Sequence, residues 1–199
     1  FRRVLFRSIS GTGLLGNGTY LGALSVASGA IFDWESSSSQ IFNNLSVGGS
    51  SGIINLNNST NSNYVTINGD QSFNGILNIY QNVYISGGNQ NTGNPGLSYA
   101  SAINIRNHGF VSLYNSTQDA QKRNNSFVGN APVTIYTGGT LYNAGTNVYL
   151  LRNITLAGGT ISSATSLTSY AAQYGTFDFY GPITVTADSR SEEHTSELQ

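Results

Sequence analysis

The 199-residue sequence contains no cysteine and no methionine, and only 9% of its residues are charged. A typical globular domain has about 25% charged residues, so the composition excludes an ordinary charged surface. Without cysteine, no disulfide can stabilise the chain, and its stability must come from packing. The formal net charge of −1 argues against a surface that tracks phosphates, so nucleic acid is not expected as a partner.

Long apolar runs and helical patterns are also missing. No run approaches the ~18 apolar residues that a membrane helix needs, so we expect no direct membrane insertion of this segment. Between Ile9 and Ser189 no stretch shows a clear 3.6-residue apolar period, and helices are not expected there.

In place of charged residues, the sequence is rich in glycine, aromatic residues, and residues with hydroxyl or amide side chains. The chain has 24 Gly, 12 Tyr and 9 Phe, and Asn, Ser and Thr fill most polar positions. These polar side chains hydrogen-bond to the backbone and to one another, which is usual in stacked β structure. Apolar residues recur in alternation with them, which disfavours intrinsic disorder.

The two ends depart from this composition. Residues 1–8 and 190–199 hold four of the eight basic and three of the nine acidic residues. The DNA string AGATCGGAAGAGCACACGTCTGAA translates to Arg-Ser-Glu-Glu-His-Thr-Ser-Glu, as at 190–197, and its reverse complement translates to residues 1–8. We interpret both ends as non-native adapter-like peptides around a fragment, 9–189, of a longer chain. The alternative is a natural basic arm and a natural acidic tail.

One unit recurs along the chain: a short alternating strand, a glycine corner and a second short strand. It is clearest in 131–145 and 153–162, with looser copies in 24–34, 45–56 and 103–114. A unit that recurs every 20–50 residues is typical of a solenoid. The first apolar residues of successive units are 21 residues apart from Leu24 to Leu45 and from Val133 to Ile154, 30 from Ile103 to Val133, and 29 from Ile154 to Ile183.

This spacing predicts an all-β parallel β-helix, a single elongated domain with loop insertions. Coils stacked at ~4.8 Å would place apolar residues over one another in continuous ladders. Glycine and asparagine would occupy the corners, because both accept a positive φ. At ~25 residues per coil we expect about seven coils.

Three segments, Val133–Leu141, Ile154–Ile161 and Tyr174–Val185, resemble passenger regions of bacterial autotransporters, and more narrowly the autotransporter-associated β-strand repeat proteins. The family's repeat contains a Thr-Tyr-Thr-Gly-Gly-Thr core, which Ile135-Tyr-Thr-Gly-Gly-Thr140 approaches. The resemblance is good over 131–189 and looser over 9–102. It implies a right-handed parallel β-helix, secreted or displayed at the outer-membrane surface of a Gram-negative-type bacterium as an adhesin, a stalk or a carrier.

Asp33 and Glu35 are the only two carboxylates of 9–189 that lie close together in sequence. Spaced i and i+2 on a strand, they share one face, and Trp34 points to the other. Asp33, Trp34 and Glu35 are therefore candidate binding residues for a carbohydrate or a calcium ion. The alternative is a solvated strand end with Trp34 turned inward.

The sequence predicts no catalytic residue, no metal ligand and no cofactor. His108 stands in a turn without a second His, a Cys or a nearby carboxylate, and no base accompanies the many Ser and Thr hydroxyls. Tyrosines either form an aromatic stripe for carbohydrate or, as we expect, pack on neighbouring coils or cover strand faces. Those considered are Tyr64, Tyr80, Tyr84, Tyr114, Tyr136, Tyr142 and Tyr149.

Three functions remain open. The first is a non-catalytic structural or adhesive segment of an autotransporter-type protein, with host or environmental glycans or surface proteins as partners. The second is a fragment of a β-helix polysaccharide lyase or hydrolase whose active coils lie outside the fragment. The third is a carbohydrate- or ice-binding solenoid with stacked threonines, a pattern that Thr184 and Thr186 approach.

Overall fold

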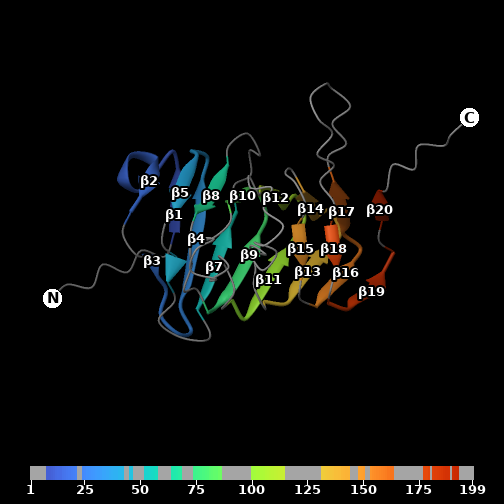
Figure 1. Ribbon diagram of the computed structural model, residues 1–199. Helices are drawn as coiled ribbons and strands as arrows, with labels where there is room; N and C mark the ends of the chain where they lie inside the picture. The colour runs from blue at the N-terminus through green and yellow to red at the C-terminus, as the bar shows by residue number, and fades with distance from the viewer. Residues whose placement is uncertain are drawn as a thin grey trace, which may run out of the picture.

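The computed structural model describes residues 8–21, 24–42, 45–46, 52–57, 64–68, 74–86, 100–114, 131–143, 148–150, 153–163, 177–179, 181–188 and 190–192. These residues form two eight-stranded sheets and two two-stranded sheets, and all the paired strands within them are parallel. Figure 1 shows the strands stacked side by side along one axis, with β1 and β2 at one end and β19 and β20 at the other.

Each coil contributes one strand to each large sheet. The first sheet contains, in order, β1 (Ser8–Gly11), β4 (Ile31–Ser36), β7 (Ile53–Leu56), β9 (Ile76–Ile79), β11 (Ala102–Ile105), β13 (Val133–Tyr136), β16 (Ile154–Ala157) and β19 (Ile183–Ala187). The second contains β2 (Thr19–Tyr20), β5 (Gln40–Phe42), β8 (Val65–Asn68), β10 (Asn82–Ser86), β12 (Phe110–Tyr114), β14 (Thr140–Asn143), β17 (Thr160–Ser163) and β20 (Arg190–Glu192).

A third side of the coil carries two short strand pairs. They are β3 (Leu24–Ser25) with β6 (Leu45–Ser46), and β15 (Val148–Leu150) with β18 (Phe177–Phe179). The one other regular element in the described ranges is a 3-10 turn at Gly16–Gly18. The prediction of an all-β parallel β-helix is confirmed.

The residues that the repeat spacing aligns in the sequence lie opposite one another in the structure. Each of the four pairs of first apolar residues is a pair of directly opposed residues on neighbouring strands. The pairs are Leu24 with Leu45, Ile103 with Val133, Val133 with Ile154, and Ile154 with Ile183.

The structure has eight coils where about seven were expected, and its outermost strands reach into the adapter-like peptides. β1 begins at Ser8, and β20 consists of Arg190–Glu192. Their composition predicts both peptides as non-native additions to the β-helix of 9–189. An edge strand offers unpaired backbone N–H and C=O groups, and pairing with them does not depend on the side chains of the added strand. The rest of both peptides lies outside the described residues.

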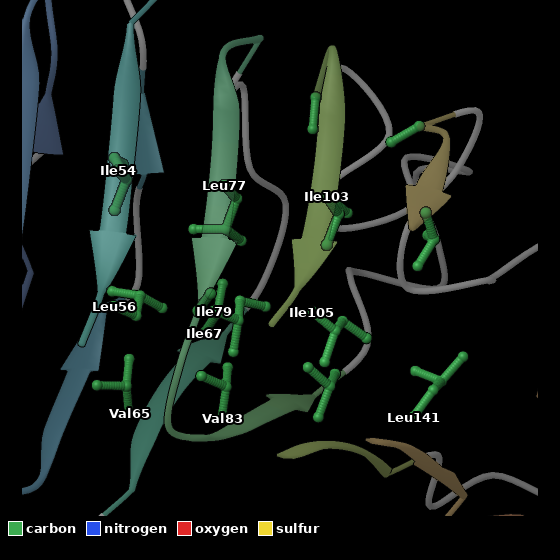
Figure 2. Packing of buried hydrophobic residues seen from close by; sticks show 14 of the residues in the cluster. Ile54, Leu56, Val65, Ile67, Leu77, Ile79, Val83, Ile103, Ile105 and Leu141 are labelled. Carbon is green, nitrogen blue, oxygen red and sulfur yellow. The ribbon is translucent and has the colours of Figure 1, made fainter. Parts of the chain in front are cut away.

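Alternation along each strand fills the interior with apolar ladders. On the first sheet, Ile54, Leu77 and Ile103 stack in one row, and Leu56, Ile79 and Ile105 stack in the next. All six are at most 1% exposed. Figure 2 shows both rows facing side chains of the second sheet, including Val65, Val83 and Leu141. Burying a Leu or Ile side chain contributes roughly 1.5–3 kcal/mol, so these ladders supply the main stabilisation.

Aromatic rings fill the core near its N-terminal end. Trp34 is 0% and Phe42 1% exposed, and their rings meet edge to face with centroids 5.5 Å apart. Two buried polar side chains tie the preceding loop to these strands. Ser36 Oγ donates to Gly13 O at 2.6 Å, and Gln40 Oε1 accepts from Leu15 N at 3.0 Å.

At the other end of the first sheet, apolar residues of the inward register are uncovered. Ile183 and Val185 pair with Ile154 and Leu156, yet they are 42% and 62% exposed. β19 is the last strand of the first sheet, so a neighbouring strand lies on only one side of these residues.

Two corner positions between the sheets restrict the residue type, each for a different reason. The first corner position has a positive φ and is occupied by His108 (φ 66°), Gly138 (φ 76°) and Gly158 (φ 87°) in successive coils. His108 shows that this position accepts a side chain. The second position is a buried glycine in all three coils: Gly109, Gly139 and Gly159.

At this second position the constraint is space. A Cβ on Gly139 would lie 2.6 Å from the carbonyl oxygen of Ile105 in the preceding coil, and a Cβ on Gly159 would lie 2.7 Å from that of Ile135. Real Cβ atoms do not approach backbone oxygens so closely. The second glycine therefore allows successive coils to stack at the corner.

We predict that Gly139→Ala and Gly139→Asn both lower the free energy of unfolding, by about 1–3 kcal/mol, because each Cβ would press on backbone. Gly29 is the matched control, since its φ is +74° and a Cβ there would meet nothing within 4 Å. Gly29→Asn should be close to neutral, because Asn tolerates the left-handed region. Denaturant unfolding of the variants measures the difference. If Gly139→Asn kept the wild-type free energy of unfolding while Gly139→Ala lowered it, the backbone φ angle, and not the lack of space for a Cβ, would explain the glycine at this position.

We also predict that Ile154→Asp unfolds the chain, because Ile154 is 1% exposed and an unpaired charge would enter the ladder. Thr155→Asp is the matched control, because Thr155 is half-buried and its register row lies on the outer side of the same strand. Thermal melting followed by circular dichroism should show a cooperative transition for Thr155→Asp and none for Ile154→Asp. Equal melting curves would contradict the inward register.

Candidate functional site

The outer face of the first sheet brings together polar residues from successive coils. Its central row is formed by the outward residue in the middle of each strand, and neighbouring members are directly opposed in register. The row runs Asp33, Asn55, Asn78, Asn104, Thr134, Thr155 and Thr184.

Within this row, side-chain amides form a hydrogen-bonded ladder, which we call the amide ladder (Asn55, Asn78 and Asn104). Asn55 Nδ2 donates to Asp33 Oδ1 at 2.6 Å, and Asn78 Nδ2 donates to Asn55 Oδ1 at 2.8 Å. Asn104 Nδ2 donates to Asn78 Oδ1 at 2.9 Å. All four side chains are half-buried.

The bonds of the amide ladder use only part of the hydrogen-bonding capacity of its side chains. A primary amide has two N–H donors and two acceptor lone pairs. The ladder uses one donor and one acceptor of Asn55 and of Asn78. Beyond the ladder bonds, each of these two amides has one further donor and one further acceptor, repeated at the ~4.8 Å strand spacing.

A second row, which we call the aromatic row (Tyr80, Arg106 and Tyr136), runs beside the amide ladder. Each of these residues lies two positions after the central-row residue of its own coil. Backbone hydrogen bonds from Tyr80 N to Leu56 O and from Arg106 N to Ile79 O fix their register. Arg106 Cζ lies 4.2 Å from the centroid of the Tyr136 ring. This is a cation–π contact, which holds the guanidinium against the sheet.

Arg106 has no acidic partner in the described part of the chain. No described carboxylate forms an ion pair with it, and its Nε atom is buried without a hydrogen-bond partner. Among the described residues it is the only cation on the outer face of the first sheet. Asp33 and Glu35 lie three strands away, a separation of roughly 14 Å at the usual strand spacing.

An apolar row borders the amide ladder on its other side. It consists of Ile31, Ile53, Ile76 and Ala102, directly opposed in register. Ile31 is 49% exposed, and the other three are half-buried. The outer face is therefore polar along its centre, with the apolar row along one margin and the aromatic row along the other.

The structure separates the three residues proposed from the sequence. Asp33 and Glu35 lie on the outer face, as their i, i+2 spacing predicts, and Asp33 accepts the bond from Asn55. Trp34 points inward and is 0% exposed. A ligand on the outer face would thus meet the two carboxylates and not the indole. No calcium-type cluster of three or more His, Cys, Asp or Glu side chains occurs among the described residues.

The tyrosines do not form a single stripe. Tyr80 and Tyr136 lie beside the first sheet, whereas the rings of Tyr64 and Tyr84 meet edge to face beside the second, with centroids 4.8 Å apart. Tyr142 packs against Phe110, also on the second sheet, at 5.2 Å. This pairing confirms that these tyrosines pack on neighbouring coils. The side chains of Tyr114 and Tyr149 lie outside the described part.

The amide ladder and Arg106 were not among the residues predicted from the sequence. A signal for the ladder was present: an Asn between two apolar residues recurs as Ile54-Asn-Leu56, Leu77-Asn-Ile79 and Ile103-Asn-Ile105. A signal for Arg106 was present too: the 30-residue spacing between Ile103 and Val133 also aligns Arg106 with Tyr136.

Comparison of the chain with protein-family models, with curated proteins and with solved structures finds no match. Within the described residues, no helix is long and apolar enough to span a membrane.

We predict that Asn78→Ala lowers the free energy of unfolding by about 2 kcal/mol, because it removes two ladder bonds worth about 1 kcal/mol each. Asn104→Ala is the matched control. It removes the one bond to Asn78 and should cost about half as much. Denaturant unfolding of both single variants and the double variant measures the coupling between them. A double variant whose cost is the full sum of the two single costs would show that the Asn78–Asn104 bond contributes no stability.

Proposed function

We propose that this chain is a non-catalytic structural and adhesive segment of a secreted or surface-displayed, autotransporter-type bacterial protein. The observation that carries the proposal is the unbroken stack of eight parallel strands in each large sheet. Because each coil packs on its neighbours, the stack has one continuous core and is roughly 34 Å long at ~4.8 Å per strand. Such an element can hold a binding surface away from a cell.

The register supports a scaffold role. Val133 and Ile154 are opposed across a 21-residue coil, and Ile103 and Val133 across a 30-residue coil. Segments of different length therefore leave and rejoin the stack without shifting it. A scaffold of this kind accepts long insertions, because closing a longer loop costs little additional entropy.

The outer face of the first sheet supports the adhesive role. Its amide ladder and aromatic row offer donors, acceptors and ring surfaces over several coils. Glycans or surface proteins, of a host or of the environment, are the partners that we propose. The proposed location is the outer surface of a Gram-negative-type bacterium, as part of a longer chain.

Surface display tests this function. The chain is anchored on a non-adherent bacterial strain, and cells retained under flow are counted on neutral-glycan, acidic-glycan and protein coatings. We expect several-fold more retention on at least one coating than with the anchor alone. Cells that display Ile154→Asp serve as the unfolded control.

Unchanged retention on all coatings would contradict the adhesive role. Release of sugar fragments from a polysaccharide by the purified chain would instead support a polysaccharide lyase or hydrolase.

A further inference from the structure

We propose that the outer face of the first sheet binds an acidic polysaccharide that lies along the stack and crosses successive coils. This inference rests on the proposed adhesive function and names its ligand class. The binding surface consists of the amide ladder (Asn55, Asn78 and Asn104) and the aromatic row (Tyr80, Arg106 and Tyr136).

The repeat of the amide ladder suits a chain of sugars. Rungs follow one another at ~4.8 Å, close to the length of one pyranose ring. A sugar hydroxyl both donates and accepts a hydrogen bond, as a Ser or Thr hydroxyl does. The donor and acceptor that remain on Asn55 and on Asn78 can therefore bond hydroxyls of adjacent sugars. Because the three ladder bonds connect the amides, they are oriented before a ligand arrives, which lowers the entropic cost of binding.

The aromatic row supplies surface for the sugar rings. Tyr80 and Tyr136 lie on either side of Arg106 and are half-buried. Tyrosine combines a rigid apolar ring with a polar hydroxyl and loses little conformational entropy on contact. The two rings are two strand spacings apart, roughly 10 Å, so a polysaccharide that spans both must contact at least three coils.

Charge makes the expected ligand acidic. Arg106 has no carboxylate partner among the described residues, and the cation–π contact with Tyr136 fixes its position. A guanidinium fork binds a carboxylate through two parallel hydrogen bonds. Asp33 and Glu35 do not neutralise it, because their distance of roughly 14 Å exceeds the Debye length of about 8 Å at physiological ionic strength.

The chemistry of the face favours a glycan over a second protein chain. The core of a protein interface is more apolar than its rim. Here the order is reversed: amides occupy the centre, and the apolar row Ile31, Ile53, Ile76 and Ala102 lies at one margin.

A matched pair of sugars tests the proposal by titration calorimetry of the purified 199-residue chain. The probes are a β-1,4-linked glucose hexasaccharide and the same hexasaccharide with each ring oxidised to glucuronate. We expect the acidic probe to bind about tenfold or more tightly than the neutral one, because only it pairs with Arg106. This preference should shrink when salt is raised from about 0.05 M to about 0.5 M.

Four variants test which residues cause the affinity for the acidic probe. Arg106→Gln should abolish the preference for the acidic probe, and Tyr136→Ala should weaken binding of both probes. Glu35→Gln removes a charge from the same face and should not weaken the acidic probe. Tyr142→Ala removes a ring from the second sheet and should leave both affinities unchanged. Melting curves confirm that each variant is folded.

Several results would overturn the inference: equal affinity for the two probes, binding of neither, or an unchanged preference in Arg106→Gln. A dimer that Tyr136→Ala dissociates would also overturn it, by showing that a second copy covers the face. If the probes fail while displayed cells still adhere to another coating, this inference alone falls. If the acidic probe binds while displayed cells adhere to no coating, the adhesive function falls and the binding surface remains.

Discussion

Backbone hydrogen bonding between one coil and the next is the constraint on which the rest of the structure depends. Parallel pairing places each residue directly over its counterpart in the coil below. Facing inward, this produces ladders such as Ile54, Leu77 and Ile103. Facing outward, it produces the amide ladder, and at the corner it presses Gly139 against the carbonyl of Ile105. The apolar core, the outer amide ladder and the glycine corner therefore all follow from the same strand register.

The fold could be predicted from the sequence because the spacing of apolar residues indicates the strand register. Leu24 and Leu45, and Val133 and Ile154, were aligned by their repeat unit alone, and the structure opposes them. The corner was predicted only in part. Positive φ accounts for Gly138, but the need for space at Gly139 depends on the coil below, which a single repeat unit does not reveal.

The candidate site was harder to predict, because its residues meet only across coils. Alternation within one strand predicted that Asp33 and Trp34 lie on opposite faces, and the structure shows that Trp34 is the one that points inward. The amide ladder requires knowing which coils are neighbours, whereas the 30-residue spacing between Ile103 and Val133 already aligns Arg106 with Tyr136. Sequence separations along the ladder are 22, 23 and 26 residues, so no fixed period aligns its members. Contacts between side chains of neighbouring coils are thus the feature of such a protein that the structure reveals and the sequence does not.

Distances along the central outer row test the stacked register most directly. Because the chain has no cysteine, cysteines introduced in pairs can carry spin labels without background. Pairing Asn55 with Thr134, Thr155 or Thr184 spans three, four or five strand spacings, and the account predicts separations that rise in equal steps through about 14, 19 and 24 Å. Separations that fail to rise in this order, as in a closed antiparallel sandwich, would contradict it.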